Sequence, residues 1–287
     1  MSSSPARSTT TSSKPSLAFL LAVSLSLLLP PLAQAQPGAD GPPRGPMVRE
    51  PDARTEQRSY HFDLAAEDMP YVLYVSSKVS DDKANPLIIA LHGLGGDGNF
   101  LLRDTFVDLA EEKGYIVAAP LGYNVSGWYG SPPIALGGQP AGPENLEELS
   151  EGDVMSVLAL MQEEFNVDPA RTYLMGHSMG GAGALFLGHK HTDIWAAIAA
   201  IAPAAFMMQP IQGEMLGKLK DEGVPVMIIQ GGADTVVPAT NSRTWADTME
   251  SLDMEGIYIE LPDGDHGNVI RDGMADIFDY FEAHPKK

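Results

Sequence analysis

The chain has 287 residues, 44% of them hydrophobic, so it can bury the core of a catalytic-size domain. Its 38 Asp and Glu residues against 18 Lys and Arg give a formal net charge of −20 at pH 7. Such a charge argues against nucleic acid or an anionic lipid surface as a partner. There is no cysteine, which excludes disulfides, thiolate metal sites and a thiol nucleophile.

Residues 1–35 have the pattern of a cleaved signal peptide. Arg7 and Lys14 precede an apolar run over residues 17–29, and the run is followed by an A-x-A cleavage site that ends at Ala35. The run is shorter than the about 20 residues of a transmembrane helix, so an uncleaved anchor is the weaker alternative. We expect cleavage after Ala35, no stable membrane anchor in the mature protein, and a secreted or periplasmic location.

Residues 36–58 are rich in Pro, Gly and charge and predict a flexible linker. From there on, the domain at residues 59–287 alternates short apolar segments with amphipathic ones. Near-continuous apolar runs such as "PLIIALHG" and "PVMIIQGG" are typical of parallel strands covered on both faces. Eight segments predict strands: 60–64, 71–76, 86–92, 115–120, 172–177, 196–202, 225–230 and 257–261.

Six helices are expected between these strands: 99–113, one after Ser150, one after Gly180, 211–222, 242–252 and 268–283. Ser150 and Asp153 form an S-x-x-D capping box, which predicts that the second helix begins there. The pattern as a whole predicts an α/β fold with a central, mostly parallel eight-stranded sheet flanked by about six helices.

The segment "GHSMGG" places Ser178 where a predicted strand meets a helix. A sharp turn at such a place tolerates only small neighbours, here Gly176, Gly180 and Gly181, and it exposes the serine hydroxyl. The alternative is an ordinary glycine-rich connection in which Ser178 caps the helix. A nucleophilic role requires a base and an acid at the same edge of the sheet.

Among the seven histidines, His266 in "LPDGDHGN" follows the last predicted strand and lies at the required edge. Asp234 in "QGGADTVVP" follows the strand before it and is the candidate acid, which would fix the imidazole tautomer. Asp263 and Asp265 are nearer in sequence to His266, but residues this close in sequence seldom reach hydrogen-bond geometry. His92 ends a strand and is expected to shape a loop.

An oxyanion hole needs two main-chain N–H groups. "LHGLGG" ends the third predicted strand and offers Leu94, while the residue after the candidate nucleophile offers Met179. The alternative for this loop is a simple turn before a helix.

With these motifs, the chain from about residue 60 to 283 resembles the α/β hydrolase family. "PLIIALHGLGG", "VDPARTYLMGHSMGG", "GGADTVVP" and "GDHGN" resemble secreted esterases related to poly(3-hydroxybutyrate) depolymerases and feruloyl esterases, which often carry cysteines that this chain lacks. The resemblance implies hydrolysis of feruloyl, short-acyl or polyester substrates through an acyl-enzyme on Ser178. It implies no cofactor and no metal.

Substrate choice is expected to lie in the loops over this edge. The connection at residues 123–148 is long, and its Trp128 and Tyr129 could hold an aryl group or a polymer unit, or could pin the loop to the body. Phe206 and Met207 follow another strand end and could line an acyl pocket or belong to the core. Two other functions stay open: a peptidase of the prolyl-oligopeptidase type, and a non-catalytic binding protein on the same scaffold.

Overall fold

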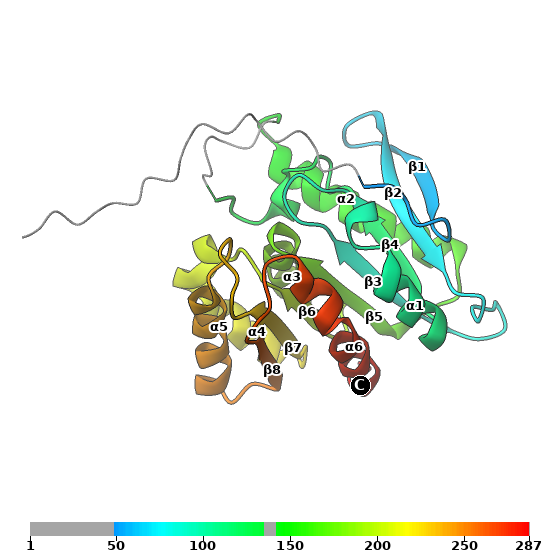
Figure 1. Cartoon of the computed structure of the whole chain (residues 1–287). Helices are drawn as coiled ribbons and strands as arrows, with labels where there is room; N and C mark the ends of the chain where they lie inside the picture. Colours follow the sequence, from blue (N-terminus) through cyan, green and yellow to red (C-terminus); the bar gives the residue numbers. More distant parts are fainter. Residues whose placement is uncertain (1–48, 135–141, 287) are drawn as a thin grey trace, which may run out of the picture. The chain divides into compact units, whose positions relative to one another are not determined.

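The computed structural model describes residues 49–134 and 142–286 (Figure 1). The predicted signal peptide, most of the predicted linker and residues 135–141 of the long connection lie outside the described residues. Eight strands form one sheet: β1 (Glu56–Phe62), β2 (Glu67–Val75), β3 (Asn85–Leu91), β4 (Ile116–Pro120), β5 (Val167–His177), β6 (Ile198–Ile201), β7 (Val226–Gly231) and β8 (Gly256–Leu261).

The strand order in the sheet is β1-β2-β4-β3-β5-β6-β7-β8. β2 is antiparallel to both β1 and β4, and every pairing from β4 to β8 is parallel. The parallel strands therefore end at a common edge. The predicted eight-stranded, mostly parallel α/β fold is confirmed.

In the described residues, six α-helices and three short 3₁₀ segments lie between the strands or, for α6, after the last one: η1 (Gly98–Phe100), α1 (Asp104–Lys113), η2 (Trp128–Gly130), α2 (Leu146–Glu164), α3 (Met179–Lys190), η3 (Phe206–Ile211), α4 (Gln212–Asp221), α5 (Ala239–Ser251) and α6 (Asn268–Ala283). α1 and α6 cover one face of the sheet, and α2 to α5 cover the other (Figure 1).

The two faces divide the core because successive strand side chains point to opposite sides. On β3, Ile88 belongs to the cluster that contains Phe278 of α6, while Ile89 belongs to the cluster that contains Leu185 of α3. All four side chains are fully buried. Burying each such side chain stabilises the fold by about 1.5–3 kcal/mol relative to leaving it exposed. Because both faces of the sheet are packed in this way, the loops that follow the strands start from a rigid edge.

The predicted linker is too long at its C-terminal end. β1 begins at Glu56, and before it Nη1 of Arg54 lies 2.6 Å from Oδ1 of Asp108 in α1. Exposed Gln57, Ser59 and His61 alternate with the more buried Arg58, Tyr60 and Phe62, and the many polar residues of this edge strand hid it in the composition. The domain therefore starts earlier than residue 59.

The predicted capping box is also wrong. α2 begins at Leu146, so Ser150 and Asp153 lie within the helix, where both are fully buried. The hydroxyl of Ser150 donates to the carbonyl of Gly122 at 2.7 Å. Oδ2 of Asp153 accepts from the amide of Gly122 at 2.6 Å, and its Oδ1 accepts from Tyr60 at 2.6 Å. These side chains hold the loop after β4 instead of starting a helix.

Candidate active site

The turn between β5 and α3 has the geometry that exposes a nucleophile. Ser178 has φ 57° and ψ −114°, a conformation that is strained for a residue with a side chain. A Cβ added to Gly176 would lie 2.1 Å from the carbonyl oxygen of Gly180. A Cβ added to Gly180 would lie 2.0 Å from the carbonyl oxygen of Leu91. Only glycine fits at these two positions, because the turn packs directly on β3.

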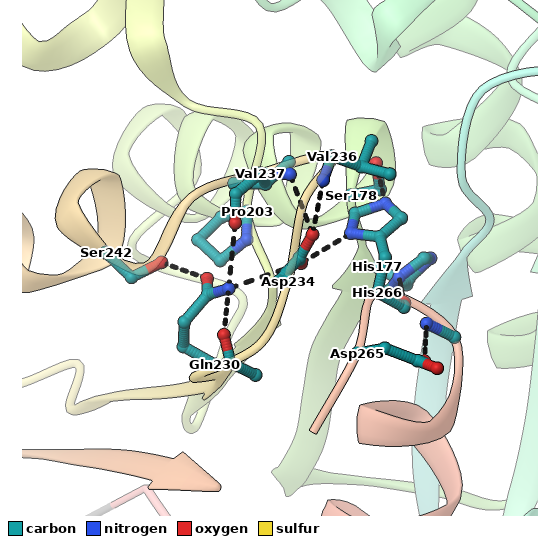
Figure 2. Close-up of polar contacts among 12 residues, drawn as sticks. His177, Ser178, Pro203, Gln230, Asp234, Val236, Val237, Ser242, Asp265 and His266 are labelled. Carbon is teal, nitrogen blue, oxygen red and sulfur yellow. Dashed lines mark hydrogen bonds and ion pairs between the residues drawn. The ribbon is translucent and has the colours of Figure 1, made fainter. Parts of the chain in front are cut away.

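Three side chains from separate loops lie in one hydrogen-bonded row (Figure 2). Nε2 of His266 lies 3.0 Å from Oγ of Ser178, and Nδ1 of His266 lies 2.7 Å from Oδ2 of Asp234. Because a carboxylate only accepts, Nδ1 carries the proton and the lone pair of Nε2 faces the hydroxyl. The Asp234 side chain is fully buried, whereas that of His266 is 20% exposed, so the base reaches solvent and the acid does not.

The electrostatic environment of Asp234 favours its ionised form. Burial alone would raise the pKa of its carboxyl, but hydrogen bonds from His266 and from the amides of Val237 and Val236 outweigh burial and lower it. The two amides donate to Oδ1 at 2.9 and 2.8 Å. The carboxylate is thereby fixed in place and keeps the charge that stabilises an imidazolium.

Gln230 supports the side chain of Asp234, a role that the sequence did not predict. It is fully buried at the end of β7, and its side-chain amide lies within donating distance of Oδ2 of Asp234 at 3.3 Å and of the carbonyl of Val237 at 3.0 Å. Its Oε1 accepts from Ser242 of α5 at 2.6 Å (Figure 2). The signal for it was a polar residue at the end of the apolar run "PVMIIQ".

The loop after β3 runs beside the nucleophile, where an oxyanion hole would lie. A Cβ added to Gly93 would be 3.4 Å from Cβ of Ser178. Within the described part of the chain, the main-chain N–H groups of Leu94 and Met179 have no hydrogen-bond acceptor, whereas that of Ser178 donates to Ile201. Neither predicted donor is occupied by another acceptor in that part of the chain.

His92 shapes this loop, as expected. It is fully buried, and its Nδ1 and Nε2 lie 2.8 and 2.9 Å from the carbonyl oxygens of Gly93 and Leu121. Burial lowers the pKa of His92, against the opposing effect of these carbonyls. The hydroxyl of Tyr129 donates to the carbonyl of His92 at 3.3 Å.

The structure contradicts substrate contact for Tyr129 and Trp128, which are 0% and 3% exposed. The ring of Tyr129 fills the space that the missing side chains of Gly122 and Gly183 leave, since added Cβ atoms there would lie 2.5 and 2.7 Å from it. Both aromatic residues pin the loop to the body, which was the alternative interpretation. Tyr129 acts on the site by supporting the loop after β3.

Phe206 and Met207 remain available to a substrate. They begin η3, which follows the short loop after β6, and there Met207 is 55% exposed and Phe206 is half-buried. Leu94 and Val236, on the loops after β3 and β7, are also exposed apolar residues. These loops all follow the carboxyl ends of the parallel strands, so the site is bordered by apolar side chains.

His177 is the second residue that sequence reasoning left without a role. It is 3% exposed, and its Nε2 lies 2.7 Å from the carbonyl oxygen of His266. Burial and the neighbouring His266 lower the pKa of His177 to about 3, so its ring is neutral.

In the described part of the chain, no helix is both long and apolar enough to cross a membrane. The same residues contain no group of three or more His, Asp or Glu side chains that could hold a metal ion.

Comparison with known sequences gives a family match. The family described as "Putative esterase" matches residues 66–257. The protein "Putative esterase NocK" of Nocardia uniformis subsp. tsuyamanensis is 28% identical over 197 residues, which are 67% of this chain and 53% of that protein. The chain thus spans about half the length of this curated relative.

Solved structures share the fold. An S-formylglutathione hydrolase from Agrobacterium tumefaciens has a TM-score of 0.64 at 18% identity, covering 80% of this chain and 95% of that one. A ferulic acid esterase from Anaeromyces mucronatus, solved with ferulic acid, has a TM-score of 0.62 at 17% identity, covering 85% of this chain and 96% of that one.

Proposed function

The chain belongs to this esterase family of α/β hydrolases, and on that premise we propose that it is an exported serine hydrolase of carboxylic esters. The observation that carries the proposal is the row formed by Ser178, His266 and Asp234, with contacts of 3.0 and 2.7 Å. A serine hydroxyl becomes a useful nucleophile only when a base takes its proton, and this row supplies that base.

In the proposed reaction, Oγ of Ser178 attacks the ester carbonyl carbon while Nε2 of His266 takes the hydroxyl proton. The resulting tetrahedral intermediate collapses, and the alcohol leaves with the proton from Nε2. Water then attacks the acyl-enzyme with the same base, and the acid is released as Ser178 regains its proton. Asp234 keeps the imidazole in the required tautomer and stabilises its protonated form.

The negative charge on the carbonyl oxygen is held by the main-chain N–H groups of Leu94 and Met179. Each such donor contributes on the order of 10² to 10³ in rate, and a positioned base about 10² to 10⁴. Both donors lack an acceptor among the described residues, which supports this assignment.

For the substrate, we propose an ester with an apolar or aromatic acyl group, with feruloyl, short-acyl and polyester compounds as the candidates. Met207 and Phe206, exposed and half-buried beside the site, would contact the acyl group. Because the mature surface is acidic, we expect neither nucleic acid nor an anionic membrane as a partner. Export rests on the signal-peptide pattern of residues 1–35, and the N-terminal sequence of the secreted protein would test it, with Gln36 expected first.

The decisive experiment compares the wild-type protein with Ser178→Ala on p-nitrophenyl esters, followed by a panel of feruloyl, acetyl-sugar and polyester substrates. We expect the variant to fold and to lose hydrolysis and labelling by a fluorophosphonate probe. Ester hydrolysis that persists in Ser178→Ala would refute the proposal. Cleavage of a proline amide in preference to every ester would favour a peptidase instead.

A further inference from the structure

His177, the residue before the candidate nucleophile, contacts the loop that carries the candidate base. Its Nε2 lies 2.7 Å from the main-chain oxygen of His266, and the two rings lie 4.6 Å apart at an angle of 49° (Figure 2). A carbonyl oxygen only accepts, so Nε2 of His177 carries a hydrogen and donates it. The contact joins the end of β5 to the turn between β8 and α6.

The ring of His177 is itself held rigidly. Phe100 of η1 stacks on it with centroids 5.6 Å apart and an interplanar angle of 24°. The other ring nitrogen of His177, Nδ1, is buried and has no hydrogen-bond partner among the described residues. Gly93 lies close to that nitrogen, because a Cβ added to Gly93 would be 3.1 Å from it. A neutral, buried ring with one donor directed at His266 is suited to orienting, and it does not reach Ser178 as a base.

The turn around His266 has two further supports. The amide of Ala233, in the loop after β7, donates to the carbonyl of Gly264 at 2.9 Å. Oδ1 of Asp265 accepts from the amides of Gly267 and Asn268 within the same turn, at 2.8 and 2.7 Å. His177 and Ser178 are consecutive residues at the end of one strand. His177 binds the main-chain carbonyl of His266, and Ser178 faces the imidazole of His266. The main chain and the side chain of His266 are therefore both positioned by the end of β5.

We propose that His177 is a positioning residue: its Nε2–H holds the main chain of His266 so that the imidazole faces the Ser178 hydroxyl. This inference rests on the proposed function, since the base has a role only if Ser178 attacks an ester. Without the donor, the turn can shift. A displacement of about 1 Å in a catalytic group costs on the order of 10²-fold in rate.

Three variants test the donor. Gln places its amide nitrogen at the same bond separation from Cβ as Nε2 of histidine, so His177→Gln keeps a donor there. His177→Leu fills similar space without one. His61→Gln is the matched control, because His61 lies on β1 with an exposed side chain.

The first measurement is kcat and KM for a p-nitrophenyl ester. The second is made on substrate-free protein: the low-field proton NMR signal of the hydrogen bond from Nδ1 of His266 to Asp234. We expect His177→Leu to lower kcat about 10- to 100-fold with KM changed less than about 3-fold, and to broaden the signal. His177→Gln should recover kcat to within about 5-fold of wild type and keep the signal, and His61→Gln should match wild type.

Wild-type kcat and signal in His177→Leu would overturn the inference, as would equal losses in the Leu and Gln variants, which would indicate packing alone. If His177→Leu does not fold, His177→Asn takes its place, because its shorter side chain cannot reach the carbonyl. A wild-type protein without esterase activity would defeat the proposed function, while the NMR comparison would still decide whether His177 orients His266.

Discussion

The side-chain amide of Gln230 lies 3.3 Å from Oδ2 of Asp234, at the point where β7 ends and its loop begins. The same amide is 3.0 Å from the carbonyl of Val237, and Ser242 of α5 donates to the other end of the Gln230 side chain. The acid is therefore attached to both the sheet and a helix. Its position depends on groups that never approach a substrate.

Replacing Gln230 by Leu should weaken both the fold and the activity. Ser242 would keep a buried hydroxyl without its acceptor, and Asp234 would lose a donor, so we expect a loss of about 1–3 kcal/mol in the free energy of unfolding. Urea unfolding measures this loss. Ser242→Ala on top of Gln230→Leu should cost less than the sum of the single changes, because the second change removes the unpaired group. Strict additivity would contradict the coupling.

Asp234→Asn should leave the fold intact and lower kcat about 10⁴-fold, as the same change does in other serine hydrolases, since an amide cannot hold the required imidazole tautomer. KM should change little. Asp263→Asn is the control, because Asp263 is an exposed residue of the neighbouring loop and was the weaker candidate for the acid. Steady-state kinetics on a p-nitrophenyl ester would contradict the assignment if the Asp263 variant were the impaired one.

Gly180→Ala should prevent the turn at Ser178 from forming, because the new Cβ would lie 2.0 Å from the carbonyl oxygen of Leu91. We expect little soluble protein and no labelling of Ser178 by a fluorophosphonate. Gly217→Ala is the matched control: nothing lies within 4 Å of an added Cβ there, in the middle of α4. This control should gain about 0.5–1 kcal/mol of stability from helix propensity. A well-folded, active Gly180→Ala protein would contradict the geometry of the turn.

Stability should fall in mild acid because His177 is buried and neutral. The pKa of His177 is about 3 in the folded chain, below the ordinary value of 6.5 that the unfolded chain has. The stabilising effect is complete above pH 6.5 and is lost as the pH falls toward 3, since only the unfolded chain binds the proton in that interval. His92, whose pKa is also lowered, acts in the same direction.

For His177 the slope approaches about 1.4 kcal/mol per pH unit between the two pKa values. Between pH 7 and pH 5, His177→Gln should therefore lose about 2 kcal/mol less than wild type in urea unfolding. The same loss in both proteins would show that His177 is not the group responsible.

Much of the fold could be predicted because the apolar runs of parallel strands are continuous and the glycines mark their ends. Ser178, Asp234 and His266 could be chosen because each follows a strand on the same edge of the sheet. A local rule failed at Ser150 and Asp153: S-x-x-D can start a helix only where the chain before it is not helical, and here α2 had already begun at Leu146.

The residues around the row were harder to foresee because their roles depend on contacts between distant segments. Tyr129 is buried because Gly122 and Gly183, 61 positions apart in the chain, leave space for one ring. Gln230 and His177 are polar residues at the ends of apolar strands, and that was a usable signal. It does not reveal the partner, since the carbonyl of His266 lies 89 positions away from His177.

The order of elements along the chain has a consequence for biosynthesis. Ser178 directly follows β5, but His266, its proposed base, precedes α6, which completes one whole face of the core. A nascent polypeptide that has emerged only as far as β7 carries an unactivated serine. On the proposed mechanism, the serine therefore gains its base only once the C-terminal part of the chain is in place beside β5.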